Sequence, residues 1–130
     1  MQSQKDIIFG NQCENISVDI IKKHFSTSNL KKCEEYFVFD FEDDDNFYEI
    51  KGRRCNHNYY NSTIISYNKI EYIKDTHKNV YFIFIFYDGH YYYKFNKNDN
   101  FEIRYGGRCD RGKTEYKKYL HIPTNILIKL

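Results

Sequence analysis

The chain has 130 residues, of which 41% are hydrophobic and 19% aromatic, and its net charge is +2. This length suits one domain and leaves no room for two cores, and the hydrophobic content excludes a disordered chain. So small a net charge identifies no class of partner, and no apolar run is long enough to cross a membrane. We therefore expect a single domain over residues 1–130.

The first predicted element is a helix from about Gln12 to Phe25. Its apolar residues fall on one broad arc and its polar residues on the other, which indicates a helix packed on a core. Asn11 is the expected N-cap. Glu14 has two interpretations that do not exclude each other: the third residue of a capping box, or an acidic residue that serves a functional site.

Two strands and a tight acidic turn are predicted next. Residues Tyr36–Glu42 and Phe47–Lys51 have the alternation of strands, and Asp43–Asn46 has the composition of a hairpin turn. With a period of two residues, the first strand should place Phe37, Phe39 and Phe41 on one face and Asp40 on the other.

The second strand of this hairpin carries an opposite-charge pair. Glu49 and Lys51 are two residues apart and therefore share one face, opposite Tyr48 and Ile50. If that face is buried, the charges carry a desolvation cost that some function should justify. The alternative is a solvated strand with an exposed ion pair.

The rest of the chain predicts a mixed sheet with helices on it. Residues 80–87 form a continuous apolar run, as in a central strand covered on both faces, and Asp88-Gly89 is a strong hairpin signal. The order of elements indicates an α/β or α+β fold. The elements predicted after the first hairpin are a helix at Ser66–Thr76 capped by Ser66, strands at Val80–Tyr87, Tyr91–Phe95 and Phe101–Tyr105, and a loop at Gly106–Lys113.

The four-residue turn brings Asp40 beside Glu49 on one face of the hairpin. Two neighbouring carboxylates repel each other unless a cation lies between them, and magnesium prefers carboxylate and carbonyl oxygens. The Ile50 carbonyl is a third candidate ligand, and Lys51 can orient a water or hold a phosphate. These residues together fit metal-assisted hydrolysis of a phosphodiester bond.

The segment FDF…YEIKGRR resembles the core of the PD-(D/E)xK nuclease superfamily, which has the restriction-endonuclease-like fold. Asp40 corresponds to the first acid, and Glu49, Ile50 and Lys51 correspond to the D/E-x-K motif. Phe39 stands where the family motif has proline. The order of elements is also similar, and the resemblance covers roughly residues 8–95. The composition resembles that of small proteins of large DNA viruses.

The resemblance implies a deoxyribonuclease that uses Mg²⁺ or Mn²⁺, bound by Asp40, Glu49 and the Ile50 carbonyl. Lys51 would be catalytic, and Glu14 resembles an additional acid found in some members, including Holliday-junction resolvases. DNA is then the expected partner, and a homodimer is expected by analogy. The rival hypothesis is a catalytically inactive nucleic-acid-binding or viral assembly module on the same fold.

Basic and aromatic residues provide candidate contacts to nucleic acid. Tyr59 and Tyr60 follow Arg53 and Arg54 and can stack on unpaired bases, although most tyrosines of strand-rich domains are packing residues. Lys69 resembles a position where many members keep a Gln or Lys, with an ordinary surface lysine as the alternative. The candidates for phosphate contacts are Arg53, Arg54, Lys69, Arg108, Arg111 and Lys113.

Two further motifs have weaker interpretations. Residues 107–114 satisfy the pattern of a phosphate-binding loop, but its residues are bulky and a helix must follow it. A basic loop on nucleic acid and a plain surface loop are the alternatives. The cysteines at 13, 33, 55 and 109 have no C-x-x-C spacing, which favours reduced thiols over a zinc site. We expect a soluble intracellular protein, located in the nucleus, the cytoplasm, or a viral factory or virion.

Overall fold

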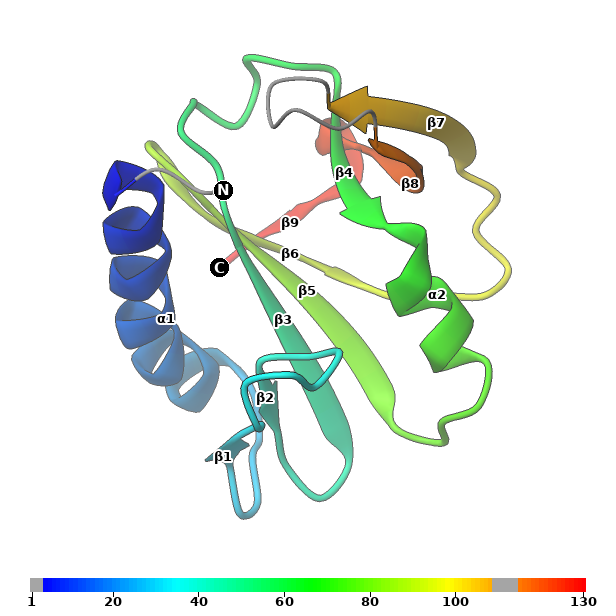
Figure 1. Ribbon diagram of the computed structural model, residues 1–130. Coiled ribbons are helices and arrows are strands. Elements are labelled where there is room, and N and C mark those ends of the chain that lie inside the picture. The colour runs from blue at the N-terminus through cyan, green and yellow to red at the C-terminus, as the bar shows by residue number, and fades with distance from the viewer. Residues whose placement is uncertain (1–3, 109–114) are drawn as a thin grey trace.

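The computed structural model describes residues 4–108 and 115–130, and its chain forms two sheets and two α-helices (Figure 1). The described elements are α1 (Gln4–His24), β1 (Lys31–Lys32), β2 (Phe41–Glu42), β3 (Asn46–Gly52), β4 (Ser62–Ser66), α2 (Tyr67–Ile73), β5 (Asn79–Phe86), β6 (Gly89–Lys94), β7 (Glu102–Arg108), β8 (Glu115–Pro123), a 3-10 turn η1 (Thr124–Ile126) and β9 (Ile128–Lys129).

The larger sheet has the strand order β1-β2-β3-β5-β6-β9. The neighbours β3 and β5 run parallel, and the other pairs of this sheet are antiparallel. The connection between β3 and β5 contains β4 and α2, because parallel neighbours need a crossover. The smaller sheet has the order β4-β8-β7 and is antiparallel. The fold is therefore the mixed α+β arrangement that the sequence predicted.

The two faces of the larger sheet are covered by different elements (Figure 1). The helix α1 packs on one face, where Cys13, Ile20 and Ile21 meet Tyr48 and other apolar residues of β3 and β5. The opposite face packs against α2 and the smaller sheet. Residues of this second cluster include Phe39, Phe47, Ile65, Ile70, Phe82, Phe84, Leu120 and Ile122.

The strand β5 confirms the prediction of a central strand. Phe82 and Phe84 belong to the cluster under α2, whereas Ile83 and Ile85 belong to the cluster under α1. All four side chains are buried. Both faces of β5 therefore need apolar residues, which explains the continuous apolar run.

The first helix begins earlier than predicted. It starts at Gln4, so Asn11 lies inside the helix and is not its N-cap. The predicted capping box therefore does not exist, and this interpretation of Glu14 was wrong. The helix continues through residues 4–11 because Phe9 also packs against the apolar cluster under α1.

The predicted strand at 36–42 is largely a turn followed by bends. The amide of Phe37 donates to the Glu34 carbonyl, and regular pairing covers Phe41–Glu42 alone. This bending puts Phe39 in the cluster under α2 and Phe41 in the cluster under α1, so the prediction that they share a face was wrong. The bent chain stacks Phe39 on Phe47, with ring centroids 5.2 Å apart.

The second half of the chain follows the prediction as far as β6. The helix α2 begins after Ser66, and the hairpin at Asp88-Gly89 pairs Phe86 with Gly89. The strands β4, β8 and β9 were not predicted. The predicted loop at Gly106–Lys113 also begins too early, because β7 extends to Arg108. Since β8 follows as an antiparallel partner of β7, no helix follows residues 107–114, and the phosphate-binding loop is excluded.

Candidate active site

The hairpin of β2 and β3 places Asp40 beside Glu49. Phe41 pairs with Tyr48, so the residue before Phe41 lies next to the residue after Tyr48. The amide of Asp40 donates to the Tyr48 carbonyl at 3.1 Å, which extends this pairing beyond β2. The tight turn thus fixes the register, and the expected meeting of the two acids is confirmed by a hydrogen bond between their side chains.

The two carboxyl groups share a buried environment. Oδ2 of Asp40 accepts a hydrogen bond of 2.8 Å from the amide of Ile50. Burial, followed by the hydrogen bond to Glu49 and the charge of Glu49, raises the pKa of Asp40 to about 7. Two carboxylates in contact are stable when one holds a proton or when a cation joins them.

Glu49 is 3% exposed, and no hydrogen bond of regular geometry reaches its Oε2 atom. Two ammonium groups are close to this atom: Nζ of Lys69 at 2.7 Å and Nζ of Lys51 at 3.8 Å. The buried carboxylate is therefore held by a close ion pair with Lys69, and Lys51 is a second cation near it.

Lys69 reaches this site from the first turn of α2. Its side chain is 15% exposed, and its ammonium also donates to the Val38 carbonyl and lies 5.9 Å from the centroid of the Phe39 ring. An ordinary surface lysine was therefore the wrong interpretation. Burial of the adjacent Ile70 against the sheet explains the position, because it turns this part of α2 inward.

The arrangement of oxygens fits a hard divalent cation. Asp40 and Glu49 supply adjacent carboxylates, and no hydrogen bond of regular geometry reaches one Glu49 oxygen. In a strand the N–H and C=O of one residue point to the same side, and the amide of Ile50 points to Asp40. The Ile50 carbonyl therefore faces the same side, as the predicted third ligand requires. No group of three or more His, Cys, Asp or Glu side chains converges among the described residues, so water would have to complete the ligand set.

The structure describes the helix that carries Glu14 but not the Glu14 side chain. The helix α1 packs through Cys13 on the face of β3 that carries Tyr48 and Ile50, whereas the ion pairs of Glu49 lead to α2. The side chain of Glu14 lies outside the described part of the structure. Its catalytic role stays a prediction.

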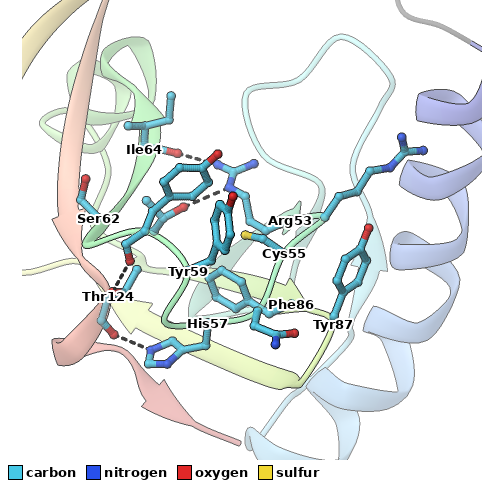
Figure 2. A pocket seen from close by; sticks show the side chains of 13 residues that line it. Arg53, Cys55, His57, Tyr59, Ser62, Ile64, Phe86, Tyr87 and Thr124 are labelled. Carbon is cyan, nitrogen blue, oxygen red and sulfur yellow. Dashed lines mark hydrogen bonds between the residues drawn. The ribbon is translucent and has the colours of Figure 1, made fainter.

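Arg53 makes several contacts within the protein, and its expected role as a phosphate contact stays a prediction. Its Nε donates to Oγ1 of Thr63 at 3.0 Å, and one terminal nitrogen donates to the Gly52 carbonyl. The other terminal nitrogen donates to the Ile64 carbonyl (Figure 2). Burial lowers the pKa of Arg53. The guanidinium thus joins the end of β3 to β4.

The other expected phosphate contacts have different outcomes. Arg54 is exposed, donates to the Lys5 carbonyl at 2.8 Å and lies 5.1 Å from the centroid of the Phe9 ring. Arg111, Lys113 and the side chain of Arg108 lie outside the described residues. Their contacts with nucleic acid stay predictions.

Sequence reasoning found the acid pair but missed the role of Lys69 within it. The resemblance placed Lys69 among nucleic-acid contacts, whereas its ammonium contacts Glu49. The sequence offered no local signal for this contact, because it depends on how α2 crosses the sheet. A lysine on the first turn of a helix that crosses the hairpin can reach the hairpin's carboxylates.

Among the described residues no helix is long and apolar enough to cross a membrane.

Comparison with known proteins gives one match. Searches of the curated proteins and of the solved structures returned no match. The family model described as "Phage putative PDDEXK endonuclease" matches residues 14–129, which include Asp40, Glu49 and Lys51. This chain therefore belongs to that phage PDDEXK endonuclease family, within the PD-(D/E)xK superfamily.

Proposed function

We propose that the protein is a metal-dependent endonuclease that hydrolyses phosphodiester bonds in DNA. The observation that carries this proposal is the buried Glu49 carboxylate, which lies against Asp40 and has the ammonium groups of Lys69 and Lys51 close to it. Membership of a family described as endonucleases supports the reaction class. A purely structural hairpin would have no reason to bury two adjacent acids.

Asp40, Glu49 and the Ile50 carbonyl would hold the cation, Mg²⁺ or Mn²⁺. When bound, such an ion polarises a phosphoryl oxygen and lowers the pKa of a bound water. Asp40 is already held in position by the Ile50 amide, at 2.8 Å. Because its pKa is raised to about 7, Asp40 would give up its proton when the cation takes the place of that proton.

The two lysines have different environments and therefore different proposed roles. Lys51 is 31% exposed, so its ammonium can meet a phosphate from solvent and stabilise the charge that develops on it. Lys69 is more deeply buried and is tied to the Val38 carbonyl. It would hold Glu49 in place, without leaving the protein interior.

Structure-specific cutting and dimerisation are finer parts of this proposal. A resolvase-like preference for branched DNA would require two sites to act on two strands, which a homodimer would provide. A cleavage assay with branched and linear duplexes and a measurement of mass in solution test these two points separately.

The experiment is a cleavage assay with duplex, single-stranded and branched DNA in Mg²⁺ or in EDTA. We expect cutting that requires the metal and is abolished in Asp40→Asn and Lys51→Ala, with Lys97→Ala as the control because Lys97 is exposed on a different loop. Equal cutting by wild type and both site variants would disprove the assignment. DNA that is bound but never cut would favour the catalytically inactive module instead.

A further inference from the structure

A pocket of about 670 Å³ is lined in part by the residues that follow β3, the strand that carries Glu49 (Figure 2). This volume falls within the range of small-molecule sites, about 300–1,000 Å³. Its lining combines the segment that follows β3 with β4, residues 86 and 87 at the end of β5, and Thr124. It includes Arg54, His57, Tyr59, Tyr60, Tyr87 and Thr124.

Three tyrosines of this lining are unusually exposed. Tyr59 is 71% exposed, Tyr60 63% and Tyr87 66%, whereas Tyr48 and Tyr93 are buried in the core. The rings of Tyr59 and Tyr60 meet edge to face, with centroids 4.7 Å apart. Figure 2 shows that Tyr59 and Tyr87 reach the pocket from separate segments of the chain. Such rings offer flat apolar faces with polar rims, which is the surface that a nucleobase stacks on.

The loop that presents Tyr59 and Tyr60 is anchored at several points. The His57 ring stacks on Tyr91 at 4.0 Å, and its Nε2 lies 2.6 Å from the Thr124 carbonyl (Figure 2). Oγ1 of Thr124 donates to the Tyr60 carbonyl at 2.9 Å. A loop held in this way pays little ordering entropy when a ligand binds.

The position of the pocket links it to the chemistry. Arg53 lies four positions after Glu49, which corresponds to about 13 Å along an extended strand. This span equals about four nucleotides at the 3.4 Å rise of one DNA strand. Lys51 and the exposed Arg54 lie along the same path and give it positive charge.

We propose that this pocket binds an unpaired nucleobase of DNA, a few nucleotides away from the bond to be cut. This inference rests on the proposed function and narrows its substrate to DNA with a single-stranded or extruded nucleotide near the scissile bond. Tyr59 and Tyr60 would stack on the base, and Lys51 and Arg54 would attract the backbone. A blunt, fully paired duplex would leave the pocket unused.

The test measures binding in EDTA, so that it does not depend on cutting. Oligonucleotides carrying 2-aminopurine are titrated with the whole protein, as single strands, as duplexes with a single-stranded overhang and as blunt duplexes. We expect quenching of the unpaired fluorophore, together with dissociation constants about tenfold larger in Tyr59→Ala and Tyr60→Ala, from the loss of one stacking contact. Tyr59→Phe should restore binding, because the ring remains.

Tyr36→Ala is the matched control, because Tyr36 is 95% exposed and outside the pocket lining. Unchanged binding and quenching in a folded Tyr59→Ala, Tyr60→Ala double variant would overturn the proposal. An equal loss of affinity of this variant for blunt duplexes would overturn it as well. Circular dichroism confirms the fold of each variant. If the protein never cuts DNA but shows the tyrosine-dependent quenching, the proposed nuclease activity is contradicted and the proposed base-binding pocket stands. If it cuts DNA but shows no tyrosine-dependent quenching, the pocket proposal alone is contradicted.

Discussion

Asp43 and Glu49 are two buried carboxylates of one hairpin, and they have different bonding partners. Each is 3% exposed. Oδ1 of Asp43 accepts from the amides of Asp45 and Asn46 at 2.9 and 2.8 Å, and its Oδ2 accepts from the Tyr48 hydroxyl at 2.7 Å. No hydrogen bond of regular geometry reaches Oε2 of Glu49. The hydrogen-bond donors around its own turn satisfy the Asp43 carboxylate. The Glu49 carboxylate is instead met by lysine ammonium groups.

This difference in partners distinguishes the two acids. The hydrogen bonds of Asp43 close the turn and hold the Tyr48 hydroxyl, and burial followed by the bond to Asp43 raises the pKa of Tyr48. Glu49 is instead paired with ammonium groups and lies against Asp40. Burying such a group of charges is costly, and the proposed cation between the two acids would offset that cost.

The largest expected effect is on cleavage. Glu49→Gln should lower the rate of DNA cutting by at least about a thousandfold, or about 4 kcal/mol of activation free energy, because a cation ligand is lost. Its free energy of unfolding should decrease, because the buried Lys69 ammonium loses its charged partner. Asp43→Asn should keep most activity at temperatures where it is folded. Single-turnover kinetics, compared at equal folded fractions, measure the cutting rate of both variants. Similar rate losses in the two variants would contradict the different roles assigned to Asp43 and Glu49.

The second effect is on stability. Asp43→Ala should lower the free energy of unfolding by about 3 kcal/mol, because the buried Tyr48 hydroxyl and Asn46 side chain lose their acceptor. Urea denaturation followed by circular dichroism measures this change. Asp45→Ala is the control in the same turn, since its side chain is exposed and its expected change is within about 0.5 kcal/mol. An equal loss in both variants would show that the Asp43 network is not what stabilises the turn.

The smallest effect is a pH dependence of the metal-free protein. The pKa of Asp40 is about 7 in the folded state against 3.8 for the unperturbed group, so the folded state binds the extra proton between these values. The free energy of unfolding should therefore fall as pH rises from about 4 to about 7. Mg²⁺ should oppose this loss, because a cation favours the ionised pair.

Asp40→Asn is the variant that isolates this pH effect. It keeps an oxygen for the Ile50 amide and removes the titrating group. Thermal unfolding in EDTA at a series of pH values should give a flatter profile for the variant than for wild type. Parallel profiles would assign the pH dependence to other groups.

The acid pair was accessible from the sequence because its geometry is local. A four-residue turn fixes the register of the hairpin, and the register alone sets Asp40 beside Glu49. The length of the first strand was not accessible, since the chain at 35–40 bends to pack Phe37 and Phe39 around Tyr72 of α2. That packing depends on an element thirty residues further along the chain.

The contact of Lys69 with Glu49 and the tyrosine pocket could not be predicted either, because both depend on residues far apart in the chain. Lys69 reaches Glu49 because α2 crosses the sheet, and no local pattern encodes that crossing. The pocket depends on Thr124, which holds the backbone at Tyr60 from more than sixty residues away. The strand β8 was missed because its alternation is diluted by lysines, and its pairing with both β4 and β7 is what makes it a strand.

The central claim is that Asp40 and Glu49 together bind a divalent cation. Its most direct test is a calorimetric titration of wild type, Glu49→Gln and Asp45→Ala with Mn²⁺ at pH 8, without DNA. We expect one ion per chain in wild type and in Asp45→Ala, and no binding in a folded Glu49→Gln at the same concentrations. Binding of Mn²⁺ by Glu49→Gln with the affinity of wild type would contradict the claim.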